Sequence, residues 1–149
     1  LAAYKKGDRK HPTMRAIAVS LTEQDIADLS AFYEQHGGKA AASAPPDGVP
    51  TASPEVTTLL TKGACASCHG ANYSKPIDGS YPKIAGQHAD YLYVALKSYK
   101  TDANPHVGRN NAIMGGQVKQ FTLPELKAMA EYLGSLPGEM RTVKEPYFR

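Results

Sequence analysis

The sequence contains little of several residue types, and each shortage excludes a class of protein. Its 149 residues include no tryptophan, three phenylalanines and two cysteines. Two cysteines cannot build the disulfide framework of a small secreted scaffold. The apolar runs are only a few residues long, far short of the roughly 20 that a membrane-spanning helix needs. The sequence therefore predicts no transmembrane segment within these residues.

Neither sign of charge dominates the chain. There are 17 Lys and Arg against 14 Asp and Glu, the formal net charge is +3, and no basic run is present, so binding to nucleic acid is not predicted. The length excludes a large enzyme, and 42% hydrophobic residues are ordinary for a globular protein. The absence of an initial Met and of a signal-peptide pattern indicates a processed or truncated chain.

Residues 39–53 divide the chain into two parts. This segment reads KAAASAPPDGVPTAS and has almost no large apolar side chain, so its ordering cannot be offset by burial. Its prolines predict an extended, semi-stiff linker. An N-terminal piece, residues 1–38, and a C-terminal domain, residues 54–149, lie on either side.

The two parts repeat each other at an offset of 100 residues. Met14 aligns with Met114 and Thr22 with Thr122, and the apolar positions that follow also match without a gap: Leu21 with Phe121, Ile26 with Leu126, Leu29 with Met129 and Phe32 with Tyr132. Upstream, residues 1–5 match residues 96–100 once a five-residue insertion is allowed. Such a repeat predicts a tandem duplication.

The first copy is incomplete, because the front half of the second copy, residues 54–95, has no counterpart in it. The N-terminal piece is therefore expected to be the back half of a domain. We expect the native chain to continue upstream by roughly 50 residues, since half a repeat leaves its apolar helix face without a partner.

The remaining patterns predict an all-α fold. Thr122 is expected to cap a helix that Pro137 and Gly138 terminate, with Glu125 completing a capping box. A helix starting at Ser53 is expected to run into Cys65, and another to span residues 88–98. Residues 70–86 are expected to form a loop, as is the Gly-rich segment around Met114, and no alternating strand pattern is present.

The chemistry-bearing motif is Cys65-Ala66-Ser67-Cys68-His69. Its spacing is the attachment signature of a c-type haem, in which two thiols form thioethers to one haem edge and the adjacent histidine binds the iron. A redox dithiol or half of a zinc site are the alternatives. Zinc needs two more ligands at comparable spacing, and the chain has no other cysteine.

The second axial ligand has three candidates in the sequence. Met114 lies between the haem motif and the last helix, beside two glycines that allow a close approach to a flat cofactor. His88 and His106 are rivals that would make the iron bis-histidine. Met14 repeats Met114, and it is the expected ligand of a first haem if the native chain continues upstream.

Residues 65–136 resemble a class I c-type cytochrome domain, and the run from Tyr81 to Leu92 is similar to that of the cytochrome c4 family, which carries two such domains and two haems. The resemblance implies that the Pro82 carbonyl accepts a hydrogen bond from His69. It also implies that Lys83, Tyr91 and Arg109 lie near the haem edge or its propionates. No first haem motif precedes Met14, which departs from the family pattern.

These features predict an electron carrier with one haem c in this chain, because histidine and methionine ligands leave no open coordination site. The expected partners are redox proteins such as a terminal oxidase, a cytochrome complex or a dehydrogenase, met transiently or as a subunit of a larger complex. A peroxidase or gas sensor with a labile Met114 is a further alternative. Covalent haem is attached outside the cytoplasm, so a bacterial periplasm is the expected location.

Overall fold

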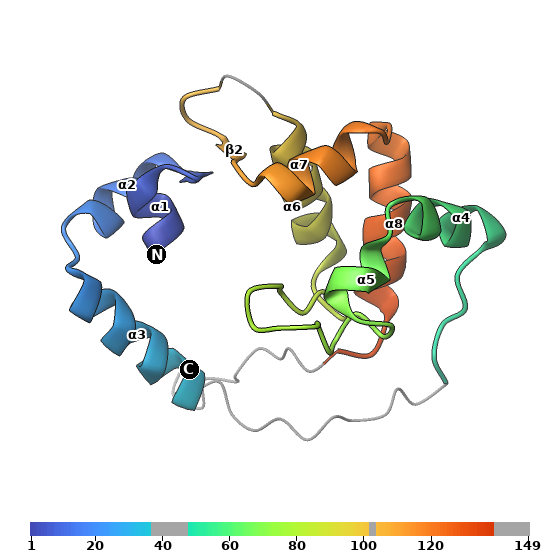
Figure 1. The fold of residues 1–149 in the computed structure, drawn as a ribbon, viewed down its shortest axis with the longest axis horizontal. Helices are drawn as coiled ribbons and strands as arrows, with labels where there is room; N and C mark the ends of the chain where they lie inside the picture. Colours follow the sequence, from blue (N-terminus) through green and yellow to red (C-terminus); the bar gives the residue numbers. More distant parts are fainter. Residues whose placement is uncertain (37–47, 102–103, 139–149) are drawn as a thin grey trace, which may run out of the picture.

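The computed structural model describes residues 1–36, 48–101 and 104–138, which form two helical lobes. The N-terminal lobe (residues 1–36) and the C-terminal lobe (residues 48–138) lie side by side in Figure 1. In chain order the elements are α1 (Ala2–Lys6), β1 (Arg9–Lys10), α2 (Pro12–Val19), α3 (Glu23–His36), α4 (Pro54–Lys62), α5 (Cys65–His69), α6 (Ala89–Lys100), β2 (Gly108–Arg109), α7 (Ala112–Lys119) and α8 (Leu123–Ser135). None of the described helices is both long and apolar enough to cross a membrane.

The core of the C-terminal lobe forms where α8 packs against α6 and α4. Leu126 is fully buried, and Met129 and Leu133 follow it on the same face of α8. The capping box is confirmed: Thr122 accepts from the Glu125 backbone N–H, and the Glu125 carboxylate accepts from the Thr122 N–H. The all-α fold is therefore confirmed in the described residues.

The helix that begins after Ser53 does not run into Cys65, contrary to the expectation from the sequence. It ends at Lys62, because Gly63 caps it and Ala64 takes a left-handed conformation with φ 46°. A Cβ on residue 63 would come within 3.1 Å of the Cys65 sulfur and 3.3 Å of the Phe121 ring. The break turns the chain, so that the Cys-x-x-Cys-His motif forms its own short helix, α5.

The segment around Met114 is helical, so its interpretation as a loop was wrong. The side chain of Asn111 accepts a hydrogen bond from the Met114 N–H at 2.9 Å and starts α7 there. The two glycines that suggested a loop are accommodated inside this helix. Tertiary packing, with Val118 of α7 buried in the core, outweighs their low helix propensity.

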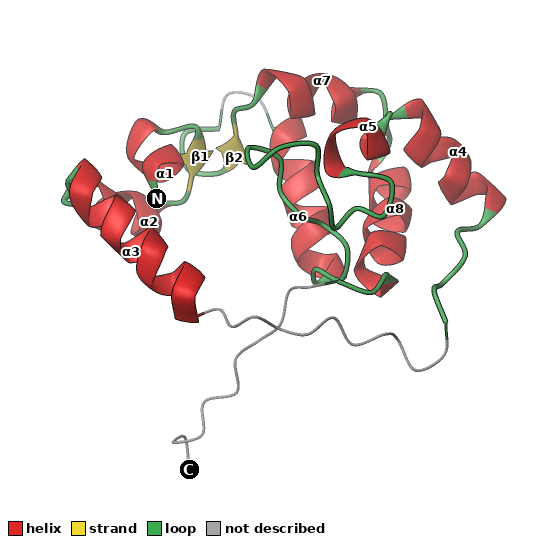
Figure 2. Ribbon diagram, turned by 60° about the horizontal axis from the view of Figure 1, so that its bottom comes forward, coloured by secondary structure: helices red, strands yellow, loops and turns green. Residues whose placement is uncertain are grey.

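A two-residue antiparallel ladder connects the lobes, as Figure 2 shows. Arg9 of β1 pairs with Arg109 of β2, and Lys10 pairs with Gly108. Strands of two residues are too short to produce an alternating pattern, which explains why the sequence did not predict them.

The repeat is visible in the hydrogen bonds as well as in the order of the elements. The Lys5 ammonium donates to the Leu21 carbonyl, and the Lys100 ammonium, at the matching position, donates to the Phe121 carbonyl. Thr22 and Asp25 form a capping box like that of Thr122 and Glu125. The tandem relationship found in the sequence thus extends to the local structure of both copies.

The two copies differ in how much of their apolar surface is covered. On α3, Leu29 is 37% exposed and Tyr33 is 70% exposed, whereas Met129 and Leu133 at the matching positions of α8 are 3% and 4% exposed. Residues 37–47, which include most of the expected linker, and residues 139–149 lie outside the described residues.

Candidate functional site: a cavity beside the Cys-x-x-Cys-His helix

The C-terminal lobe contains a cavity of about 520 Å³, within the range of cofactor sites. Helices α5, α6, α7 and α8 and the loop before α6 contribute to its wall. Most of the side chains that line it are apolar, among them Leu92, Leu96, Phe121, Leu126 and Met129. Among the described lining residues the charged ones are Lys83 and Arg109, and none is a carboxylate.

Helix α5 brings both thiols and the histidine of the motif to this cavity. Cys65 and Cys68 are unpaired and partly buried, and burial raises the pKa of the Cys65 thiol. His69 is buried and only 6% exposed.

The orientation of His69 is set by the Pro82 carbonyl, which lies 2.8 Å from its Nδ1. A carbonyl oxygen can only accept, so Nδ1 carries the hydrogen and Nε2 keeps its lone pair. A partner of this kind fixes the tautomer and ring orientation of a metal-binding histidine. The ring of Tyr81 also meets His69 edge-on, with centroids 6.5 Å apart.

The loop from residue 70 to residue 86 carries Pro82 to this position. The Tyr73 carbonyl accepts from the backbone N–H groups of Ile84 and Ala85 at 2.9 and 3.1 Å, and the Cys68 carbonyl accepts from Ile77 at 3.1 Å. These bonds hold the loop against α5. The loop predicted from composition at residues 70–86 is therefore fixed by backbone hydrogen bonds.

Met114 of α7 lines the same cavity, whereas the other candidate axial ligands do not. His88 is the exposed N-cap residue of α6, and His106 is exposed in the loop before β2. Met14 is partly buried on α2, in the other lobe. The structure thus brings Met114 together with His69 and leaves the two rival histidines outside the cavity wall.

Lys83, Tyr91 and Arg109, which the resemblance placed near the haem edge, all line the cavity. Arg109 donates to the Tyr91 hydroxyl at 3.0 Å, and its guanidinium lies 5.4 Å from the centre of the Tyr91 ring and 5.6 Å from that of Tyr99. Burial opposes ionisation of Tyr91, but the hydrogen bond from Arg109 and the charges of both arginines outweigh it and lower its pKa.

One residue at this site was missed from the sequence. Arg9, in the N-terminal lobe, also donates to the Tyr91 hydroxyl, at 3.0 Å. The signal was present, because Arg9 stands at the repeat position of Arg109. Its contact with the other lobe could not be predicted without the β1–β2 ladder.

These residues fit haem c. The cavity supplies two thiols and an oriented imidazole from α5, a thioether from α7 and a largely apolar wall. A zinc site would need further ligands, and in the part of the chain that the structure describes no group of three or more His, Cys, Asp or Glu side chains could hold a metal ion.

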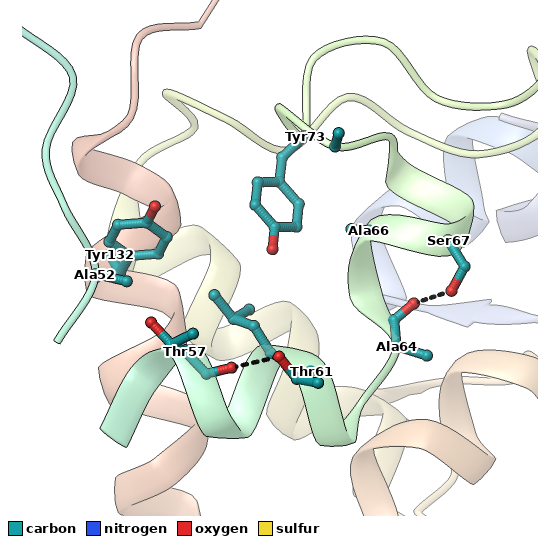
Figure 3. Close-up of a pocket in the computed structure, with 10 residues that line it drawn as sticks. Ala52, Thr57, Thr61, Ala64, Ala66, Ser67, Tyr73 and Tyr132 are labelled. Atoms are coloured by element: carbon teal, nitrogen blue, oxygen red, sulfur yellow. Dashed lines mark hydrogen bonds between the residues drawn. The ribbon is translucent and has the colours of Figure 1, made fainter. Parts of the chain in front are cut away.

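A second hollow of about 410 Å³ lies at the motif helix, α4 and α8. Figure 3 shows Tyr73 and Tyr132 at this hollow, along with alanine and threonine side chains. The residues that line it include no histidine, cysteine, methionine or charged side chain. The cavity beside Cys65 and His69 is therefore the candidate site.

A covalent haem motif, an oriented histidine and a helical apolar pocket together define a c-type cytochrome domain. The family model for cytochrome c matches residues 55–137. The chain belongs to the cytochrome c family, and it is similar over most of its length to proteins named cytochrome c4. Haem c and electron transport are accordingly its cofactor and its class of function.

Three curated relatives illustrate the similarity. Cytochrome c-553 of Nitratidesulfovibrio vulgaris is 38% identical over 49% of this chain and 70% of its own length. Cytochrome c4 of Azotobacter vinelandii is 26% identical over 86% of this chain and 61% of its own length. A thiosulfate dehydrogenase electron acceptor of Stutzerimonas stutzeri is 26% identical over 93% of this chain and 65% of its own length. The chain thus spans less than two thirds of the last two proteins.

The fold of the chain is similar to that of a solved structure. The cytochrome c4 of Acidithiobacillus ferrooxidans superposes with a TM-score of 0.66, over 91% of this chain and 79% of that one, at 24% identity. The similarity extends over both lobes of the present chain, since it covers more than the C-terminal lobe alone.

Proposed function

We propose that the C-terminal lobe is an electron carrier in which His69 and Met114 are the axial ligands of a haem attached to Cys65 and Cys68. When bound, haem c supplies a one-electron Fe(II)/Fe(III) couple. The observation that carries the proposal is that the oriented His69 and the Met114 thioether line one cavity from different helices.

The residues at the cavity favour an electron carrier over an enzyme. His69 and Met114 would occupy both axial positions, which leaves none for a substrate, and the Pro82 carbonyl holds the imidazole in one orientation. The apolar side chains would limit the access of water to the bound haem, and no carboxylate in the described wall could serve as a distal acid or base. Electrons would therefore pass to and from partners by outer-sphere transfer.

The ligand pair is tested by substituting each candidate in the holoprotein. Met114→Ala should abolish the sulfur-to-iron charge-transfer band of the oxidised protein and open the reduced protein to carbon monoxide. His88→Ala and His106→Ala are the matched controls and should leave both properties unchanged. A missing charge-transfer band in the unsubstituted protein would overturn methionine ligation, and its rapid binding of carbon monoxide would favour a sensor or peroxidase.

We also propose that Met14 is the distal ligand of a first haem, in a cytochrome domain of which the N-terminal lobe is the back half. Support comes from the shared hydrogen bonds of the two copies and from the exposed apolar face of α3, whose counterpart on α8 is buried. The intact mass and haem content of the protein from its native source test this. One haem per chain of the present length would contradict it.

The expected partner is a periplasmic redox protein. One relative is named a thiosulfate dehydrogenase electron acceptor, and another is named the cytochrome subunit of sulfide dehydrogenase. Both names support a dehydrogenase as the electron donor, met either transiently or as a permanent subunit. A terminal oxidase or another cytochrome is the acceptor that we propose from the sequence. A monodisperse holoprotein of monomer mass would argue against the permanent complex, and fractionation of cells would locate the protein.

A further inference from the structure

The hollow of about 410 Å³ beside α5 shares a wall with the haem cavity. Leu60 of α4, Ala64 and Ser67 line both spaces. Cys65 lines the haem cavity, while its neighbours in the chain, Ala64 and Ala66, line the hollow. A molecule held in the hollow would therefore lie next to the haem edge that is attached at Cys65.

Tyr73 brings a phenol hydroxyl without a partner to this hollow. The residue is only 9% exposed, and its hydroxyl points between α4 and α5 in Figure 3. Among the residues that the structure describes, this hydroxyl has no hydrogen-bond partner. Burial raises the pKa of Tyr73, so the hydroxyl keeps its proton and can donate it. Because buried polar groups normally have a partner, the hydroxyl indicates an acceptor atom of a ligand.

The backbone holds Tyr73 in one place. Its φ of 57° lies in the left-handed region, which is uncommon for a residue other than glycine. The Tyr73 N–H donates to the Gly70 carbonyl at 2.9 Å, and the Tyr73 carbonyl accepts from the N–H groups of Ile84 and Ala85. Uncommon backbone conformations that the surroundings fix in this way are typical of ligand sites. The ring is thus positioned before any ligand arrives.

The wall of the hollow selects a flat and uncharged ligand. No described residue that lines it is charged, so a charged ligand would lose its hydration without gaining a partner. The rings of Tyr73 and Tyr132 and the side chain of Leu60 suit an aromatic body. Thr61 and Ser67 donate their hydroxyl protons to nearby backbone carbonyls. The Tyr73 hydroxyl is therefore the buried donor that remains for the ligand.

We propose that this hollow binds a small hydroquinone, which passes electrons through the shared wall to the haem on Cys65 and Cys68. The inference rests on the proposed function, to which it adds a small-molecule electron donor. A hydroquinone has a flat uncharged ring, and its oxygen atoms can accept from the Tyr73 hydroxyl both before and after oxidation. Its position beside a one-electron carrier favours a redox-active ring over an inert one.

The reaction balances with water as the proton acceptor. A hydroquinone becomes a quinone when its two O–H bonds break and it loses two electrons and two protons. Each electron reduces one ferric haem to the ferrous state, and the protons pass to water through the open side of the hollow. Two oxidised haems are therefore reduced for each hydroquinone consumed.

The first experiment measures binding in the absence of electron transfer. Oxidised holoprotein is titrated with trimethylbenzoquinone in a calorimeter, since neither component can oxidise the other. We expect one quinone per chain. Tyr73→Phe removes only the hydroxyl and should weaken binding roughly five- to tenfold. Tyr33→Phe, at a position 70% exposed on α3, is the matched control and should bind like the unsubstituted protein.

The second experiment measures haem reduction by trimethylhydroquinone in an anaerobic stopped-flow instrument. In the unsubstituted protein the rate should saturate as the hydroquinone concentration rises, because a complex forms first. Ala66→Leu fills the hollow, so the saturable binding should be lost and the rate should be proportional to concentration. Ala27→Leu, at an exposed position of α3, is the matched control and should retain saturation.

The outcomes separate this inference from the proposed function. Equal binding by Tyr73→Phe and the unsubstituted protein, or saturation retained in Ala66→Leu, overturns the hydroquinone site. If Tyr73→Phe does not incorporate haem, loss of binding and of saturation in Ala66→Leu supports the site. Hexaammineruthenium(II), a charged reductant that the hollow would not bind, should reduce all variants at the same rate. If it reduces the haem while the hydroquinone shows no saturation, the site is overturned and the carrier proposal stands; if it cannot reduce the unsubstituted protein, both are overturned.

Discussion

The Nδ1 atom of His69 donates to the Pro82 carbonyl at 2.8 Å, across 13 positions of the chain. This bond gives the imidazole one tautomer and one orientation, so the geometry of the haem ligand depends on the loop that carries Pro82. That loop is anchored at Tyr73 and Cys68 by backbone hydrogen bonds. Residues that shape the loop are therefore expected to affect the haem site without touching it.

Gly70→Ala should destabilise the holoprotein and disturb the His69 environment. Gly70 has φ +83°, and a Cβ at this position would lie 2.0 Å from the Lys75 carbonyl oxygen. With ψ 158° this is a positive-φ conformation that only glycine adopts readily, and it costs another residue on the order of 1–3 kcal/mol; the overlap adds to this. Thermal unfolding and the near-ultraviolet circular dichroism of the holoprotein would measure the effect; a melting temperature equal to that of the unsubstituted protein would contradict the close approach.

Gly116→Ala should have the opposite effect and serves as the matched control. Gly116 lies inside α7, and a Cβ there would meet no atom within 4 Å. Replacing a helical glycine by alanine stabilises a protein by about 0.5–1 kcal/mol. Denaturant titration of the holoprotein should show a higher midpoint with an unchanged slope.

Met114→His should lower the reduction potential if Met114 is a ligand. Histidine in place of a methionine thioether favours the oxidised iron, and axial ligands set haem potentials over a range of about 0.8 V. We expect a fall on the order of 100 mV, measured by potentiometric titration. The same substitution at Met129, whose side chain is buried in the core, should instead impair folding; a potential unaltered by Met114→His would exclude Met114 from the coordination sphere.

Leu126→Ala should destabilise the C-terminal lobe strongly. Leu126 is fully buried at the centre of the core, and truncation of a buried leucine costs about 2–5 kcal/mol. Leu123→Ala, at a position 41% exposed, should change the free energy of unfolding by less than about 0.5 kcal/mol. Chemical denaturation of both variants gives the comparison, and similar losses in the two would show that the core lies elsewhere.

The capping box of α8 should make stability depend on pH at the acid end. Backbone and side-chain hydrogen bonds from Thr122 lower the pKa of Glu125 below its ordinary value of 4.5. A carboxyl whose pKa is depressed in the folded state contributes stability above its unfolded pKa, and this is lost as the pH falls through the folded value. In Glu125→Gln the melting temperature should therefore fall less on acidification below pH 4.5 than in the unsubstituted protein.

The helix caps and the attachment motif were predictable because their information is local. The Thr122–Glu125 capping box lies within four consecutive residues, and the structure forms it as expected. The end of α4 at Lys62 and the helical state of Met114 were not predicted. Both depend on packing against distant residues: Phe121 crowds Gly63, and the core buries Val118 of the Met114 helix.

The amino-acid sequence by itself determined the haem motif, the all-α class, the duplication and the candidate axial ligands, because each of these is carried by a short pattern or by the repeat. Only the tertiary structure decided which of those residues meet. It brought Met114 to the cavity wall with His69 and left His88 and His106 outside. It also brought Arg9 within hydrogen-bond distance of the Tyr91 hydroxyl. The two-residue ladder that does this depends on how the surfaces of the two lobes pack, and no pattern along the chain encodes it.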